Sequence, residues 1–113
     1  MSRLPNPNRR LELQERQRQA DGAGGYAESW VTLGTLWGAL RPGYGRERAV
    51  AAGAVSSVRY RIYVRAAPEG AVSRPRAGQR LVEGGRVFDI EAVAEHGGDG
   101  LFLVLYAREE VAT

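Results

Sequence analysis

The 113-residue sequence predicts an all-β fold, a small antiparallel β-barrel or sandwich of about six strands with one short helix and a long loop. The clearest evidence is in residues 57–65, where arginines and one tyrosine alternate with apolar residues that we assign to the core: Val58, Tyr60, Ile62 and Val64. This alternation is typical of a strand with one buried and one solvated face. Short apolar runs between glycine-rich turns, in the last third of the chain, are typical of an antiparallel meander.

The other strands are bounded by glycine and proline. The pattern predicts strands over residues 11–20, from residue 26 or 28 to residue 40, and over residues 80–83, 86–95 and 101–106. Residues 11–20 would also suit a helix, and we favour the strand. Residues 46–54 are mostly good helix formers followed by a glycine stop, so a short helix is expected there.

One domain accounts for most of the chain, because 113 residues is the usual size of a single core. Residues 1–10 contain Pro5 and Pro7 among polar residues and are expected to form a flexible N-terminal arm, so the barrel domain covers residues 11–113. Residues 66–79 have no periodicity. A structureless stretch of this length in a small domain is usually functional or disordered, and we interpret it as the functional loop.

The composition excludes several classes of site. The chain has no cysteine and one histidine, which removes disulfides and the usual zinc sites. There is no lysine for a phosphate-binding loop, and no Ser-His-Asp set stands out. No apolar run reaches the length of a membrane span. We therefore expect no enzymatic activity, no cofactor, no metal site and no membrane contact.

The charges are unevenly placed along the chain. Residues 41–80 hold nine arginines and two glutamates, a net charge of +7, whereas residues 81–113 hold two arginines and seven acids, a net charge of −5. This division predicts two faces of opposite sign, suited to complementary neighbours or to DNA on one side.

The aromatic residues complete the predicted core. Trp30 and Trp37 are seven positions apart, so in a regular strand they point to opposite faces. We place Trp37 in the interior, together with Phe88 and Ile90, and leave Trp30 open.

Several segments, in order, resemble the phage head-tail adaptor family of tailed phages and gene transfer agents. The acidic-glycine turn at residues 21–25 precedes Trp30, and residues 36–40 (Leu-Trp-Gly-Ala-Leu) are similar to the family's tryptophan strand. Residues 62–65 resemble its strand ending in arginine, and residues 80–93 resemble its Arg-Ile and Gly-x-x-Tyr-x-Ile signature. Phe88 replaces the usual tyrosine, and the glycine within residues 36–40 suggests a bulge.

This resemblance implies a structural virion protein of the head-tail connector, of the kind called a stopper or connector, assembled in the bacterial cytoplasm. Such a protein forms a ring beneath the portal that extends or closes the channel for packaged double-stranded DNA. The portal or an adaptor ring lies above it, and a tail terminator or tail tube lies below. From the size of one subunit we favour a hexamer, with a dodecamer as the alternative.

Within that ring, Arg74, Arg76 and Arg80 are the candidate site residues. They either face DNA phosphates in the channel, which fix DNA without reading sequence, or pair with acids of a neighbouring subunit. The alternative function, from another class, is a small-barrel nucleic-acid-binding module whose arginine-rich strand and loop form the binding face.

Overall fold

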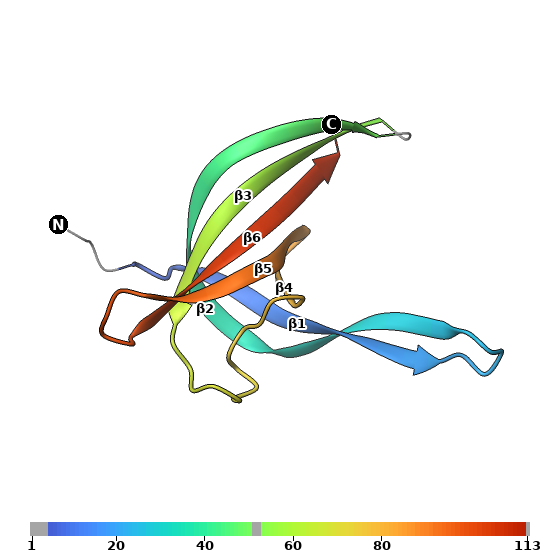
Figure 1. Cartoon of the computed structure of the whole chain (residues 1–113), viewed down its shortest axis with the longest axis horizontal. Coiled ribbons are helices and arrows are strands. Elements are labelled where there is room, and N and C mark those ends of the chain that lie inside the picture. Colours follow the sequence, from blue (N-terminus) through green and yellow to red (C-terminus); the bar gives the residue numbers. More distant parts are fainter. Residues whose placement is uncertain (1–4, 51–52, 113) are drawn as a thin grey trace.

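The computed structural model describes residues 5–50 and 53–112. These residues form six antiparallel strands and, within the described ranges, no helix (Figure 1). The strands are β1 (Arg9–Ala20), β2 (Tyr26–Val50), β3 (Gly53–Arg65), β4 (Arg80–Glu83), β5 (Arg86–His96) and β6 (Phe102–Ala112).

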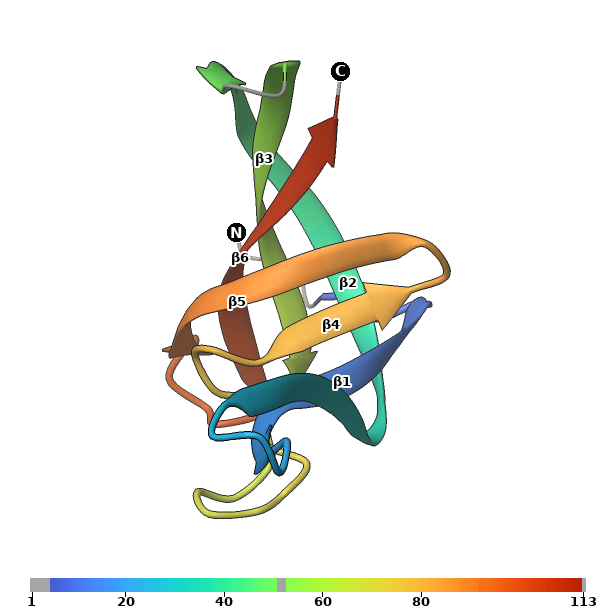
Figure 2. The same cartoon turned by 90° about the vertical axis from the view of Figure 1, so that its right-hand side faces the viewer.

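The strands close into a barrel in the order β1-β2-β3-β6-β5-β4 (Figure 2). β4 is the shortest strand, and it completes the barrel by pairing with residues 12–14 of β1. The prediction of an all-β fold is confirmed, and a closed barrel describes the fold better than a sandwich.

Apolar and polar side chains alternate along the strands, and the inward-facing apolar ones form a single cluster inside the barrel. Ile62, Val64, Phe88 and Ile90 lie in it, as expected from the sequence, and Tyr60 is half-buried against it. Val58 is only half-buried and lies outside the cluster. The buried members are Leu11, Leu13, Ile62, Val64, Leu81, Phe88, Ile90, Leu103, Leu105 and Ala107.

Trp37 lies outside this core. Its side chain is 55% exposed, so its assignment to the interior is wrong. The neighbouring Leu36 packs against the core and Gly38 is buried, and consecutive residues of a strand face opposite sides. Trp37 must therefore point outward.

A bulge in β2 places both tryptophans on the same outer surface. The β1–β2 register shifts between Leu13 and Gln14, and this leaves Leu33 as an extra residue of β2. One extra residue reverses the alternation on its far side. Trp30 and Trp37 consequently share a face, and the inference that they point in opposite directions fails.

Gly38 is a close-packing position and not a bulge. It pairs in register with Arg9 on one side and Val64 on the other. A Cβ at this position would lie 2.8 Å from Leu11 Cδ1 and 3.1 Å from Ile62 Cγ2. The interior has no room for a larger residue here.

The short helix expected at residues 46–54 is absent from the described part of that segment. Residues 46–50 continue β2, and β3 begins at Gly53. The two strands pair directly, with Ala49 opposite Ala54, so cross-strand pairing overrides a weak helix preference. The proline and glycines at residues 42–45 shift the register and do not end the strand.

Tyr63 was expected on a solvated face, yet it is only 4% exposed. The His96 ring packs edge-on against it at a centroid distance of 4.7 Å. The Arg41 guanidinium lies 5.1 Å from the Tyr63 ring centroid. Side chains of the outer surface thus cover this ring.

The start of β1 and the 66–79 loop lie close to where the sequence puts them, whereas the division into an N-terminal arm and a barrel domain stays a prediction. β1 begins at Arg9, two residues before the predicted start of the barrel, and Pro5 is buried. The remainder of the expected N-terminal arm, residues 1–4, lies outside the described residues. Residues 66–79 connect β3 to β4 without a strand, in the predicted range.

Two parts of the sheet extend beyond the barrel (Figure 1). Residues 15–32, which we call the arm, form a two-stranded ribbon from β1 and β2 with a glycine-rich turn at its tip. The hairpin between β2 and β3 extends in another direction, alongside the end of β6. The molecule is therefore elongated, with extents of 54 × 34 × 21 Å.

Replacing Gly38 tests how closely the Leu11 and Ile62 side chains pack against the β2 backbone inside the barrel. Gly38→Val forces methyl groups against Leu11 and Ile62, and we expect a loss of about 1–3 kcal/mol in the free energy of unfolding, measured with urea. Gly34→Val on the same strand is the control, because nothing lies within 4 Å of a Cβ there. Equal stability of the two variants would contradict the packing described here.

Candidate functional site

The 66–79 loop is fixed to the barrel at both ends. Ala66 N donates a hydrogen bond to Leu101 O at 2.9 Å, and Gly78 N donates one to Ile90 O at 2.9 Å. Ile90 N returns a bond to Gln79 O at 3.0 Å. Backbone bonds also form turns within the loop, and the Pro75 side chain is fully buried. The loop is an ordered excursion of the backbone.

Arg74, Arg76 and Arg80 each have a partner within this chain. Arg74 Nη1 donates to the Ala67 carbonyl at 2.8 Å. Arg76 Nη2 lies 2.9 Å from a Glu15 carboxylate oxygen. The three side chains therefore hold the loop and β4 in place and do not converge on one point.

Arg80 is the first residue of β4, and its side chain lies on the outer surface that β4 shares with β1. Its Nε donates to Gln14 Oε1 at 2.8 Å, and its guanidinium lies 4.1 Å from the Trp30 ring centroid. Arg74 and Arg80 are half-buried, whereas the Arg76 side chain is 71% exposed. Of the three candidates, Arg76 is the one best placed to reach a partner.

Gln79 is a site residue that the sequence analysis missed. It is 4% exposed, its Oε1 accepts a hydrogen bond from Arg76 N at 2.8 Å, and its Nε2 donates to Glu15 Oε1 at 3.4 Å. A glutamine before a strand gives no signal in a single sequence, because its partner is 64 residues away.

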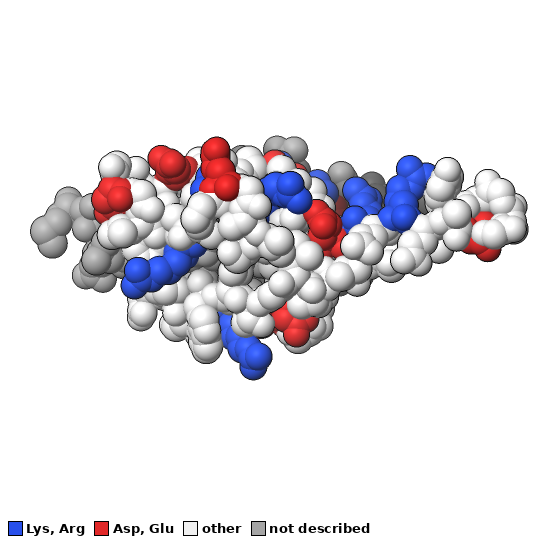
Figure 3. Space-filling model, turned by 90° about the horizontal axis from the view of Figure 1, so that it is seen from below, with Lys and Arg blue, Asp and Glu red and all other residues white. Residues whose placement is uncertain are grey.

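An open hollow of about 540 Å³ lies between the loop, the base of the arm and β5. Leu33 and Val93 supply apolar lining, Glu15 and Arg76 lie at one side, and the loop supplies the rest through residues 69–77. Seen from below, this side of the molecule carries arginines and acids intermingled, without one large basic patch (Figure 3).

The expected division into a basic and an acidic face is not seen on the side drawn in Figure 3. The physical reason is the topology. β3, from the basic segment, pairs along its length with β6, from the acidic segment. β5, also from the acidic segment, lies on the other side of β6, and Arg59 of β3 reaches Glu91 of β5 at 2.9 Å.

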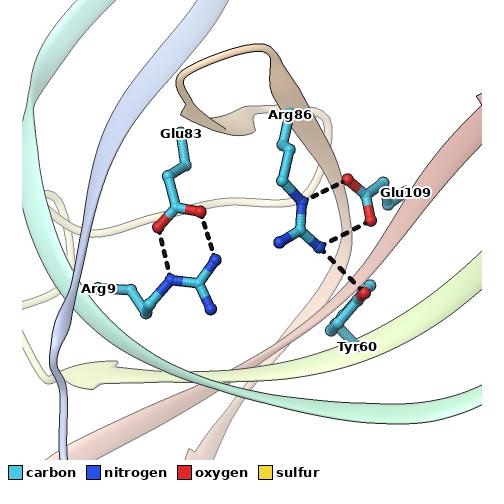
Figure 4. Close-up of polar contacts among 5 residues, drawn as sticks. All are labelled: Arg9, Tyr60, Glu83, Arg86 and Glu109. Carbon is cyan, nitrogen blue, oxygen red and sulfur yellow. Dashed lines mark hydrogen bonds and ion pairs between the residues drawn. The ribbon is translucent and has the colours of Figure 1, made fainter.

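A polar cluster closes one region of the barrel, where five side chains from β1, β3, β4, β5 and β6 meet (Figure 4). Arg86 donates to both Glu109 carboxylate oxygens, at 2.8 and 3.0 Å, and to the Tyr60 hydroxyl at 3.1 Å. Arg9 makes the same two-pronged contact with Glu83.

These ion pairs hold both carboxylates in the charged form. The hydrogen bond from Arg86 lowers the pKa of Glu109, and the one from Arg9 lowers the pKa of Glu83. The pKa of Arg86 is raised, chiefly by its bond to Glu109. A carboxylate that stays ionised is poorly suited to donate a proton, so the arrangement fits a structural connection and not general acid–base chemistry.

Within the described ranges, no group of His, Cys, Asp and Glu residues could hold a metal ion. The same residues form no helix long and apolar enough to cross a membrane.

Comparison with known proteins decides the family. The family model for the phage head completion protein matches residues 3–110. The chain belongs to the phage head completion protein family. The resemblance inferred from its segments is confirmed, as is the role of a structural virion head protein.

A chain in the solved structure titled "Virion of native gene transfer agent (GTA) particle" is similar to this head completion protein over its full length. The two share 47% identity and a TM-score of 0.87, covering 97% of this chain and 100% of that chain. No curated protein sequence matches. The predicted location in a virion or virus-like particle is confirmed.

The Arg86–Glu109 pair should make the stability of the head completion protein depend on pH. Because the folded-state pKa values of Glu109 and Glu83 lie below the ordinary 4.5, the unfolded chain binds more protons as the pH falls through that region. The free energy of unfolding should therefore be maintained above pH 4.5 and decrease as the pH drops through the lowered pKa values.

Glu109→Gln removes the charge on one side of this pair. We expect the free energy of unfolding at pH 7 to fall by about 1–2 kcal/mol, and its dependence on acid pH to weaken. The loss is smaller than for a fully buried pair because Arg86 is partly solvated. Glu28→Gln is the control, since its pair with Arg16 is exposed at 3.8 Å. Urea titrations from pH 7 to pH 3 measure both. An unchanged acid profile for Glu109→Gln would contradict this role.

Proposed function

We propose that this head completion protein forms a ring beneath the portal, where it extends or closes the DNA channel and provides the surface to which the tail attaches. The observation that carries the proposal is the 47% identity, over 100% of its length, with a chain of a gene transfer agent virion. Membership of a structural family also favours a role without catalysis.

The shape of the subunit supports assembly with neighbours. Three aromatic side chains, Tyr26, Trp30 and Trp37, lie on or near the outer surface, and Tyr26 and Trp37 are more than half exposed. Exposed tryptophan and tyrosine beside arginine are the residues enriched in the cores of protein interfaces. Ribbons that project from a barrel also give one subunit contacts on several sides.

The dimensions favour six copies over twelve. If neighbours touch along the 34 Å dimension, six subunits place their centres about 34 Å from the axis and twelve place them about 66 Å away. Subtracting half of the 21 or 54 Å dimension leaves an opening radius of about 7–24 Å for six and at least about 39 Å for twelve. A hexamer better matches a channel for one duplex.

Within the ring, Arg76 is the residue of the loop most able to touch DNA, because it is the most exposed of the three candidate arginines. Arg74 and Arg80 support the loop and β4 from within the subunit. The nucleic-acid-binding module loses support, since its arginines are bonded within the chain and interleaved with acids.

Deletion of the gene tests the proposal directly. A connector has no substitute in the particle, so we expect filled or leaking heads and separate, complete tails in negative-stain images. Joined particles of normal appearance from the deletion strain would refute the proposal.

Arg76→Ser distinguishes a channel contact from a subunit contact. A channel role predicts joined particles that lose DNA more readily, with a loss that depends on salt, because phosphate contacts are electrostatic. A subunit role predicts fewer rings and unjoined heads.

Glu15→Gln is the matched control, since it removes the in-chain partner of Arg76 and keeps the cation. If Glu15→Gln reproduces the defect of Arg76→Ser, the ion pair itself is what matters. Normal DNA content and transfer by Arg76→Ser particles would exclude both roles.

A further inference from the structure

We propose that the arm of one copy docks in the hollow beside the 66–79 loop of the next copy in the ring. The inference rests on the proposed function, because it names the contact that joins neighbouring subunits. The tip of the arm and the hollow lie on different parts of one chain, so a contact between them runs head to tail and can close into a ring.

The arm lacks support within its own subunit. β1 pairs with β4 only as far as Gln14, and β2 meets β3 only from Gly38 onward. Residues 15–20 and 26–32 therefore form a ribbon of two strands with both outer edges unpaired. An isolated two-stranded ribbon is marginally stable in water, so a covering partner is expected.

Near its tip, the arm presents an aromatic ring and an unmatched positive charge. Tyr26 is 64% exposed, and the Arg18 guanidinium lies 4.5 Å from its ring centroid. Arg16, on the same face, is paired with Glu28. Arg18 has no acidic partner among the residues that the structure describes.

The hollow presents an apolar side chain and an acid, Val72 and Glu69, which complement Tyr26 and Arg18 of the arm. Val72 on the wall of the hollow is 66% exposed, and together with Tyr26 it is the most exposed large apolar side chain of the described residues. Glu69 lies on the same wall. The two loop arginines are bonded to Ala67 O and Glu15, which leaves Glu69 without a bonded partner in the described part of the chain.

These features favour a protein partner for the arm over nucleic acid. The arm contains Arg16 and Arg18 against Glu15, Asp21 and Glu28, a net charge of −1. Binding to DNA requires a basic footprint, which this ribbon lacks. Tyrosine and arginine at a projecting tip, facing the exposed Val72 and the unpaired Glu69 of the hollow, are the components of a protein contact.

The arm runs along the 54 Å dimension of the subunit (Figure 1), so neighbours that it joins overlap along that dimension by about the length of the arm, which keeps their centres roughly 34 Å apart. Its six β1 residues beyond Gln14 span about 20 Å at the usual rise of a strand. The hollow includes Glu15 and Leu33, which lie at the base of the arm. The tip of one arm would therefore lie beside the base of the next, and the arms would follow one another around the ring.

A charge exchange tests the contact. Arg18→Glu and Glu69→Arg are each expected to weaken self-association by about tenfold or more, measured by analytical ultracentrifugation and by the yield of joined particles. The double variant should recover most of the loss, and Arg18→Lys, which keeps the charge, should assemble as the parent does. Circular dichroism checks that each variant is folded.

A cross-link provides a second measurement in assembled particles. The chain has no cysteine, so Ala23→Cys at the arm tip and Ala71→Cys in the hollow introduce the only two thiols. Oxidation with diamide should give a ladder of linked subunits on a non-reducing gel. Each single variant should give no ladder beyond dimers.

The outcomes separate this inference from the proposed function. Rings that form normally with either charge reversed, no recovery in the double variant, or no ladder from joined particles would overturn the arm contact alone. Charge reversal that leaves rings of this chain intact but releases another virion protein would assign the arm to that protein and also overturn it. Joined particles made without this chain would instead refute the proposed function.

Discussion

Barrel closure depends on a short seam between β1 and β4. Only residues 12–14 of β1 pair with β4, and Leu13 and Leu81 are the buried pair at its centre. Without the seam, the core between β1 and β5 would open to water, because β4 is the only strand that joins them in the barrel order. Three backbone pairs are few for that task, and side chains supplement them.

Polar side chains connect the two sides of the seam along its length. Arg9 binds Glu83 beyond one end of the seam. At the other end, Gln14 accepts from Arg80 at the last backbone pair, and Glu15 binds Arg76 and Gln79 just beyond it. The three arginines that the sequence suggested as channel residues therefore have different structural roles. Arg80 and Arg76 stabilise the seam, Arg74 braces the loop that leads to it, and only Arg76 combines this with high exposure.

The sequence predicted most of the fold because local patterns determine it. Alternation identified β3 and its buried residues Ile62 and Val64, although it put Tyr63 on the wrong face, and glycine turns gave the bounds of β4 and most of β5. The errors arose where one residue changes the alternation or where pairing outweighs propensity. A bulge at Leu33 cannot be seen in a single sequence, yet it decides the face of Trp30 relative to Trp37. The described residues of the alanine-rich segment predicted as a helix, 46–50 and 53–54, belong to strands because β2 and β3 pair there.

The site was less predictable than the fold for a related reason. Arg9–Glu83, Arg76–Glu15 and Arg86–Glu109 join residues 74, 61 and 23 positions apart. No local pattern indicates such partners. Barrel closure brings the first two pairs together, and the pairing of β5 with β6 brings the third together. The range of the 66–79 loop was correct, but its arginines could be interpreted only after their acceptors were located.

The arm follows from the same closure. β4 is four residues long, whereas β1 has twelve and β2 has twenty-five, so the longer strands must run past the barrel. Residues beyond Gln14 have no β4 partner and gain little burial within the subunit. A chain that needed only a stable barrel would gain nothing from this length. The unequal strands are better explained by contacts outside the subunit. In the proposed head-to-tail contact, the next copy would supply the burial that the arm lacks.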